Sequence, residues 1–161
     1  MKFQQIETPI EDSLKGLKAN PNIKFLCLDV GKKKIGIATG CFNLAISIPY
    51  KVIRNQGREK NVNVIMDICK KIRAENIVIG IPLRDSELET SAQYIIKFAE
   101  QLSLSRAKIY FQDESFSSCS AADLLQNTGL SRKKKDSIDD AVAASIILTN
   151  FFHRVKNLIN T

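Results

Sequence analysis

The sequence predicts an α/β fold, a mixed sheet with helices on its faces. The first observation behind this is a pair of apolar runs of strand length, 23–30 and 34–41, joined by a short charged turn that is typical of a hairpin. The second is the continuous apolar run 77–81, as expected of a buried parallel strand. The third is that helical and strand patterns alternate through the rest of the chain, which places helices against the sheet.

From the N-terminus, the expected elements are strands at 23–30, 34–41 and 45–53, a helix at 58–73, a strand at 77–81, a helix at 86–104, a strand at 108–112, a short helix at 117–125 and a last helix from 137 to at least 153. Pro49 marks the third strand as an edge strand or a bulged one. Residues 1–22 are expected to be an N-terminal extension with a short amphipathic helix, and residues 23–157 a single domain.

The charge balance is basic and the cysteine pattern is unremarkable for a reducing compartment. The 161 residues include 24 Lys and Arg against 17 Asp and Glu, a net charge of +7, which favours a polyanion or an anionic membrane surface as partner. No apolar run approaches the roughly 20 residues of a membrane span and no secretory leader precedes the first strand, so we expect a cytoplasmic protein. Of the two kinds of partner that the charge allows, we expect nucleic acid and not a membrane. The four cysteines form no C-x-x-C pair and His153 is the one histidine, which argues against a zinc site.

Three acidic residues stand at the ends of expected elements and are the candidates for catalysis. Asp29 ends the first strand, Glu114 follows the strand at 108–112, and Asp139 falls in the first turn of the last helix. Because the carboxyl ends of parallel strands lie at one edge of a sheet, these acids are expected to converge there. Crowded carboxylates repel one another unless a cation joins them, and oxygen ligands without Cys or His suit Mg²⁺ or Mn²⁺. The pattern therefore predicts a site that holds two such ions for displacement at a phosphodiester.

Each of these acids also has a purely structural interpretation, which stays open at this point. Asp29, just before Gly31, is compatible with a turn-forming residue. Glu114 and Asp139 are compatible with acids that complement the dipole at a helix start, and Asp140 with a helix cap, since it follows Ser137 by three residues.

Basic residues near the same elements are the candidates for binding a nucleic-acid backbone. They are Lys32, Lys33 and Lys34 after the first strand, Arg84 after the strand at 77–81, and Arg132, Lys133, Lys134 and Lys135 in an expected loop before the last helix. In most proteins such runs are solvated loops, so their meaning depends on whether they adjoin the acids.

Four ordered blocks of the chain resemble the YqgF family. The blocks are Leu28–Ala38, similar to the opening signature of that family; Ile77–Leu83, similar to its VVGLP strand; Asp113–Ser118, similar in part to its DERxTT segment; and Ile138–Leu148, similar to its iDxxAAxxIL helix. The resemblance runs from about Ile23 to Phe152, and four blocks in order are far more specific than any one of them.

The YqgF family consists of RNase H-like proteins described as Holliday junction resolvases and as pre-16S rRNA nucleases. The resemblance implies an RNase H-like fold, a mixed five-stranded sheet with three antiparallel strands followed by parallel strands, flanked by helices. It places the active acids on Asp29, Glu114 and Asp139. It implies a metal-dependent nuclease, a hydrolase acting on ester bonds, with 5′-end processing of pre-16S rRNA in ribosome biogenesis as the expected role. A Holliday junction DNA substrate stays open as an alternative, as does the choice between monomer and homodimer.

Departures from the family pattern keep other function classes open. Ser115 stands where the family has Arg, and Lys32 where it usually has Thr. Ser115 and the basic loops fit a non-catalytic nucleic-acid-binding or ribosome-assembly factor. Asp29-x-Gly31 followed by Gly36 also fits the first phosphate loop of actin-like ATP-binding folds. Those folds need a second, related domain, for which 161 residues leave no room.

Overall fold

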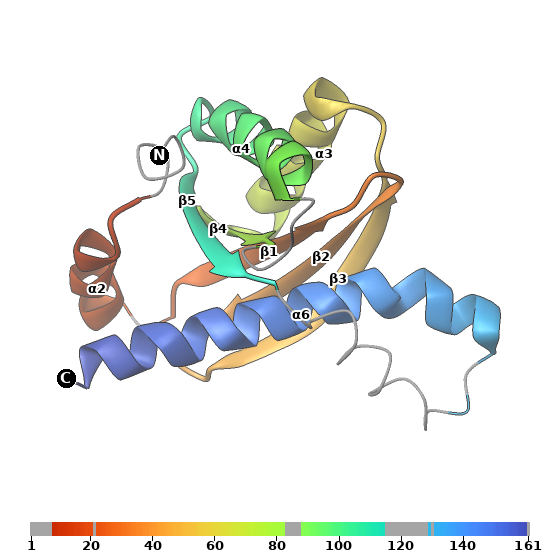
Figure 1. The fold of residues 1–161 in the computed structure, drawn as a ribbon. Coiled ribbons are helices and arrows are strands. Elements are labelled where there is room, and N and C mark those ends of the chain that lie inside the picture. The colour runs from red at the N-terminus through yellow and green to blue at the C-terminus, as the bar shows by residue number, and fades with distance from the viewer. Residues whose placement is uncertain (1–7, 21, 83–87, 115–128, 130, 161) are drawn as a thin grey trace.

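The computed structural model describes residues 8–20, 22–82, 88–114, 129 and 131–160 (Figure 1). Within these ranges, the side chains of residues 11–14, 88–90, 133 and 135–137 lie outside the description. The same holds for the expected helix at 117–125 and for Ser86, Arg84 and Ser115.

Five strands form one mixed sheet in the order β3-β2-β1-β4-β5. They are β1 (Lys24–Val30), β2 (Lys34–Cys41), β3 (Ile46–Arg54), β4 (Asn76–Ile81) and β5 (Lys108–Asp113). The pairs β1–β2 and β2–β3 are antiparallel, whereas β1–β4 and β4–β5 are parallel. The predicted RNase H-like arrangement of three antiparallel strands followed by parallel strands is therefore confirmed. Pro49 lies on the edge strand β3 beside a break in register, as its position predicted.

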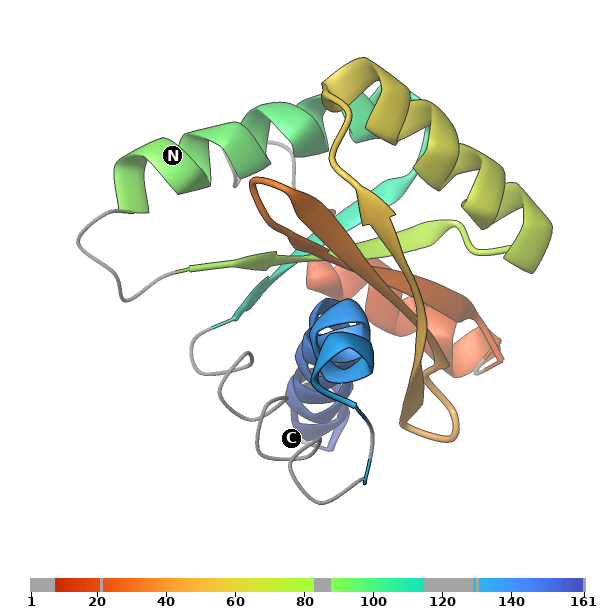
Figure 2. The same ribbon diagram turned by 90° about the vertical axis from the view of Figure 1, so that its right-hand side faces the viewer.

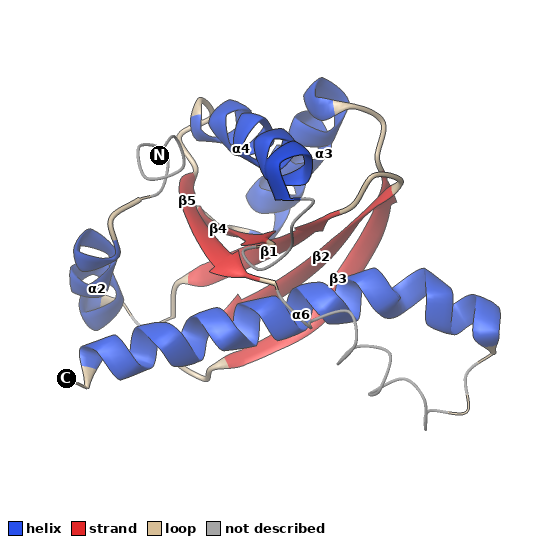
Figure 3. Cartoon of the chain, in the orientation of Figure 1, coloured by secondary structure: helices blue, strands red, loops and turns tan. Residues whose placement is uncertain are grey.

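Helices cover both faces of the sheet (Figure 2). They are α2 (Ile10–Ala19), α3 (Arg58–Ile72), α4 (Leu88–Ser103) and α6 (Arg132–Ile159). The pair α3 and α4 covers one face, while the long α6 crosses the other with α2 beside its C-terminal end; Figure 3 shows the strands in red between these layers. None of the helices in the described part of the chain combines the length and the apolar character that crossing a membrane requires.

Side-chain alternation along β1 divides the core in two. Leu26 and Leu28 point into an aliphatic cluster under α3 and α4. Phe25 and Cys27 point the other way, into a cluster under α6 that contains several aromatic rings. Asp29 continues the second series, so its carboxyl group faces α6.

The start of α6 differs from the prediction. The run Arg132–Lys135, interpreted from the sequence as a loop, forms the first turn of the helix. The Ser131 hydroxyl accepts a hydrogen bond from the Lys134 N–H (3.3 Å) and caps the helix there. Arg and Lys are good helix formers, so a capped basic run continues into the helix rather than breaking it.

Candidate active site

Asp29 and Glu114 meet at the edge of the sheet where the parallel strands end. Asp29 lies near the end of β1, and the Glu114 N–H donates to the Ile81 carbonyl (3.1 Å) at the end of β4. A hydrogen bond joins the two carboxyl groups, with Glu114 as the protonated partner that donates to Asp29. The structure thus brings together two of the three acids predicted from the sequence.

Burial keeps a proton on this carboxyl pair at neutral pH. Burial is the main cause that raises the pKa of Glu114 to about 8, and the neighbouring Asp29 charge adds to it. Burial likewise raises the pKa of Asp29 to about 6, followed by the charge of Asp140. Two carboxyl groups that share a proton in this way are prepared to exchange it for a cation.

A glycine in β4 makes room for the Glu114 side chain. A Cβ atom on Gly80 would lie 2.7 Å from Glu114 Oε2 and 2.8 Å from Ile147 Cδ1 of α6. Real Cβ atoms are not found at such distances, so a side chain here would make the ends of Glu114 and Ile147 move. With glycine, the Glu114 carboxyl lies against bare β4 backbone on the face of the sheet covered by α6. The sequence showed Gly80 only as part of an apolar strand, and its role required the three-dimensional structure.

A second glycine lets α6 approach Asp29. Gly36 is the cross-strand partner of Asp29 in β2. A Cβ atom on Gly36 would overlap the Asp140 carbonyl and lie 2.9 Å from the Ala141 nitrogen. The α6 backbone therefore passes directly over Gly36, and this places Asp140 beside Asp29.

The charges of Asp139 and Asp140 both raise the pKa of Asp29, and Asp140, which the sequence analysis did not choose as a catalytic acid, has the larger effect. Asp140 is also in line with Ala144 and Ile147, which are buried against the sheet. The spacing Asp-x-x-Ala-Ala-x-x-Ile-Leu, read from Asp140, was the sequence signal that identifies this residue.

The structural interpretations of these two aspartates were wrong. Because α6 begins at Arg132, Asp139 and Asp140 lie about two turns inside the helix rather than in its first turn. At that depth neither residue caps the helix or complements the positive end of its dipole. The Oδ1 atom of Asp139 is buried.

The predicted basic residues fall into three groups. Lys32 and Lys33 are exposed in the turn between β1 and β2, and Lys34 is exposed at the start of β2, so all three follow Asp29 within five residues of the chain. Arg132 and Lys134 are exposed in the first turn of α6, in the part that projects beyond the sheet (Figure 1). Arg84 lies outside the described residues, and so do the side chains of Lys133 and Lys135.

Asn55 is a residue that the sequence analysis missed. Its amide group donates to the Gly31 carbonyl (2.9 Å) and its backbone N–H to the Lys33 carbonyl (2.9 Å), which fixes the lysine turn. Asn61, nearly fully buried at the start of α3, donates to the Asn55 side-chain oxygen (2.7 Å). The Asn55 amide nitrogen in turn donates to the Tyr94 hydroxyl of α4 (3.2 Å). This network connects the turn after Asp29 to both helices of the opposite face.

The donor chemistry of the site suits a hard divalent cation. Carboxylate oxygens without Cys or His are the ligands that Mg²⁺ and Mn²⁺ prefer, and Asp29 and Glu114 present such oxygens side by side. In the conformation described, no set of three or more Asp, Glu, His or Cys residues among residues 8–20, 22–82, 88–114 and 131–160 is arranged to hold a metal ion. Among the described residues the fit is therefore to the pair, and an acid of α6 would become a third ligand only if it moved closer.

Comparison with known proteins matches the part of the chain that contains the sheet and the acids. The family model described as "RuvX: Holliday junction resolvase" matches residues 23–154. The chain belongs to the RuvX family. Two curated relatives bear the name "Putative pre-16S rRNA nuclease". The relative from Rickettsia rickettsii (strain Sheila Smith) is 36% identical over 140 residues, and the one from Rickettsia bellii (strain OSU 85-389) is 34% identical; each alignment covers 86% of this chain and 91% of the relative.

Solved structures of two resolvases are also similar. One is Thermus thermophilus RuvC in complex with a Holliday junction substrate, with a TM-score of 0.45, 14% identity and coverage of 82% of this chain and 94% of that one. The other is the yeast mitochondrial Holliday junction resolvase Ydc2, with a TM-score of 0.49, 11% identity and coverage of 96% and 90%. The family description and the names of the relatives all denote nucleases, so this chain is a nuclease of the RuvX family.

Proposed function

We propose that this RuvX-family chain hydrolyses phosphodiester bonds of structured RNA, specifically at the 5′ end of a 16S ribosomal RNA precursor, in a reaction that needs Mg²⁺ or Mn²⁺. The names of its relatives support the RNA substrate. The observation that carries the proposal is the hydrogen-bonded carboxyl pair of Asp29 and Glu114, held together at the end of the parallel strands. A largely buried pair of acids is costly to maintain unless it serves a cation.

Asp29 and Glu114 would hold the metal, with Asp139 and Asp140 of α6 as the candidates for further ligands. A divalent ion bound there supplies an activated water and positive charge for the leaving oxygen. Glu114 gives up its proton when the pair becomes a ligand set, and the two carboxylates then fix the position of the cation at the sheet edge. Gly36 and Gly80 allow the α6 backbone and the Glu114 side chain to reach these positions.

The lysine turn would orient the nucleic-acid backbone. Lys32, Lys33 and Lys34 are exposed next to Asp29, where their charges can contact phosphates on either side of the reacting bond. Asn55 acts as a positioning residue for this turn, because it holds the carbonyls of Gly31 and Lys33.

A cleavage assay on the full chain tests this proposal. The substrates are a pre-16S RNA fragment and a four-way DNA junction, each with Mg²⁺ or Mn²⁺. We expect Asp29→Asn and Glu114→Gln to lower the rate roughly 100-fold or more, because each removes a ligand charge and keeps the shape. Asp67→Asn, a change at an exposed acid of α3, is the matched control and should cleave as the wild type does. Equal rates in Asp29→Asn and wild type would refute the assignment of the site.

The same assay separates the two aspartates of α6. We expect the larger loss of rate in Asp140→Asn, because its charge acts more strongly on Asp29 than that of Asp139. A loss confined to Asp139→Asn would instead support the residue that the resemblance indicated.

Junction resolution is the second candidate function, favoured by the description of the matching family model. It would use the same acids on a branched DNA. Cleavage of the junction with no cleavage of the RNA would select it, and binding of either substrate without cleavage in any divalent metal would indicate a non-catalytic assembly factor.

A further inference from the structure

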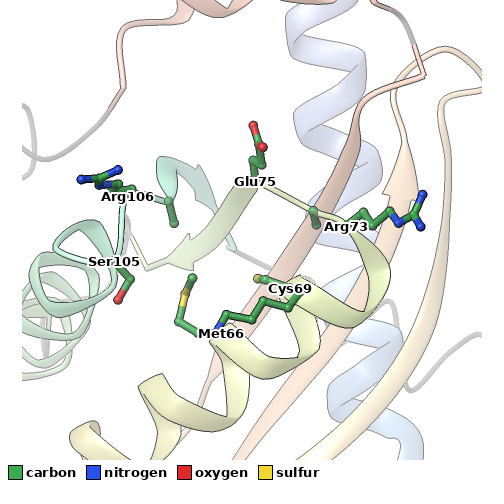
Figure 4. A pocket seen from close by; sticks show the side chains of 9 residues that line it. Met66, Cys69, Arg73, Glu75, Ser105 and Arg106 are labelled. Atoms are coloured by element: carbon green, nitrogen blue, oxygen red, sulfur yellow. The ribbon is translucent and has the colours of Figure 1, made fainter.

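A pocket of about 570 Å³ lies at the opposite edge of the sheet from the acids, where β4 and β5 begin (Figure 4). The last turns of α3 and the turn that precedes β5 form its walls. Its apolar part consists of Met66, Cys69, Ala74 and Ala107. This volume is within the range of small-molecule sites, roughly 300–1,000 Å³.

Two arginines that line the pocket have an uncommon backbone conformation. Arg73 has φ 61° and Arg106 has φ 65°, values at which glycine is normally found. Ala45 is the one further non-glycine residue with positive φ in the described part of the chain. Strained conformations of this kind concentrate at functional sites, so the two arginines call for an explanation.

Arg73 illustrates the point most clearly. It ends α3 in a Schellman-type turn, in which its own N–H donates to the Lys70 carbonyl (3.4 Å) and the Ala74 N–H to the Cys69 carbonyl (2.9 Å). Glycine is the usual residue at this position because it has no Cβ. An arginine there places its positive charge at the C-terminal end of the α3 dipole, and its side chain also lines the pocket.

The pocket rim carries an excess of positive charge. Lys70, Arg73 and Arg106 line it together with one acid, Glu75, and the Ser105 hydroxyl. In Figure 4 the Arg73 and Arg106 side chains lie on opposite sides of the apolar part formed by Met66 and Cys69, and their guanidinium groups point outward from it at the rim. A matching ligand has a flat, weakly polar body for the centre and anionic groups for the rim.

We propose that this pocket binds a nucleoside phosphate, with the base against Met66, Cys69 and Ala107 and the phosphate on Arg73 or Arg106. Arginine is well suited to phosphate because its guanidinium group donates two parallel hydrogen bonds. Ser105 and Glu75 provide a hydroxyl group and a carboxylate for the polar edge of the base. A free nucleotide and an unpaired nucleotide of a single strand share this chemistry. The site goes beyond the proposed catalysis, since it lies at the other end of the strands.

The substitution that tests this site is Arg73→Gly combined with Arg106→Gly. Because both residues have positive φ, glycine removes the side chains while it relieves the backbone, and the melting temperature should be unchanged or higher. Ala45→Gly is the matched backbone control, since Ala45 has φ 49° and does not line this pocket. Lys18→Ala combined with Lys97→Ala is the charge-matched control, since both lysines are exposed on other helices.

The full chain is titrated with adenosine monophosphate, with inorganic phosphate or with a short single-stranded RNA. Binding is monitored by calorimetry and by the chemical shifts of backbone amides in NMR spectra. We expect the monophosphate to shift amides at 66–75 and 105–107, and the double arginine variant to weaken its binding at least about tenfold while both controls bind as the wild type does. Tighter binding of the RNA than of the monophosphate, with the same dependence on the arginines, would identify the single strand as the source of the nucleotide; equal binding would identify the free nucleotide.

Three results would overturn the proposal: no shift at these amides at millimolar monophosphate, equal affinity in the double arginine variant, or inorganic phosphate that binds as tightly as the monophosphate. Asp29→Asn should bind the monophosphate as the wild type does. A failure of the catalytic proposal and a failure of this one are therefore distinguishable.

Discussion

Raising the pH should destabilise the metal-free fold through the carboxyl pair at the end of β1. The pKa of Glu114 is about 8 in the folded chain against its usual 4.5. Between these values the folded protein holds a proton that the unfolded chain has released, so the folded state binds more protons. Stability therefore falls as the pH rises through this window and is fully present below it.

The size of the effect follows from the two pKa values. One pKa unit corresponds to about 1.4 kcal/mol, so a single group that titrates over the whole window would contribute between about 4 and 5 kcal/mol. Because Glu114 is partly open to solvent, we expect a loss of about 3 kcal/mol in the free energy of unfolding from pH 4.5 to pH 8. The pKa of Asp29, about 6, lies inside the same window, so the pair titrates as a unit.

Urea unfolding across this pH range, in the presence of a chelator, measures the loss directly. The variant Glu114→Gln keeps the hydrogen bond to Asp29 but has no proton to release, so its stability should change much less with pH and should exceed that of the wild type at pH 8. Glu100→Gln, at an exposed position on α4, is the control and should follow the wild type. Parallel curves for the wild type and Glu114→Gln would show that the pair does not retain a proton, and the reasoning would fail.

Three further changes have defined outcomes. Gly36→Ala places a methyl group on the Asp140 carbonyl and should lower the free energy of unfolding, measured in urea, by about 3 kcal/mol. Its control is Gly16→Ala, whose Cβ meets nothing within 4 Å and which should raise the free energy of unfolding by roughly 0.5–1 kcal/mol. If Gly36→Ala left the stability unchanged, α6 would not lie over β2. Asn55→Ala should cost about 2 kcal/mol and speed hydrogen exchange at the turn amides, and unchanged exchange would exclude its positioning role. Saturating Mn²⁺ should raise the melting temperature of the wild type but not of Asp29→Asn, and equal shifts would place the metal elsewhere.

Hydrophobic periodicity and the geometry of parallel strands were enough to predict the strand faces and the meeting of two acids. Alternation in β1 correctly placed Asp29 on the same face as Phe25 and Cys27. The convergence of Asp29 and Glu114 followed from the rule that parallel strands end at one edge. These features are local or topological, so they need no knowledge of how side chains pack.

The features that escaped prediction depend on contacts between distant segments. The sequence predicted a loop at Arg132–Lys135 because Ser137 also fits a helix cap, whereas in the structure Ser131 caps the helix. Choosing between Asp139 and Asp140 requires knowing which stripe of α6 faces the sheet, since adjacent helical residues point about 100° apart. The roles of Gly36 and Gly80 are likewise set by atoms that approach from elsewhere in the chain.

One half of α6 is anchored to the core, and its first turn extends beyond the sheet. Its C-terminal half is fixed by Phe151 and Phe152 in the aromatic cluster and by Arg154, which donates to the Phe111 carbonyl and the Gln112 side chain (both 2.9 Å). Its basic first turn overhangs the sheet, and the close contact over Gly36 lies between the two ends. Asp139 and Asp140 lie in the segment over Gly36, between the overhang and the anchored half, within one continuous helix of 28 residues. A force on the basic overhang is therefore transmitted to the two aspartates through the helix itself.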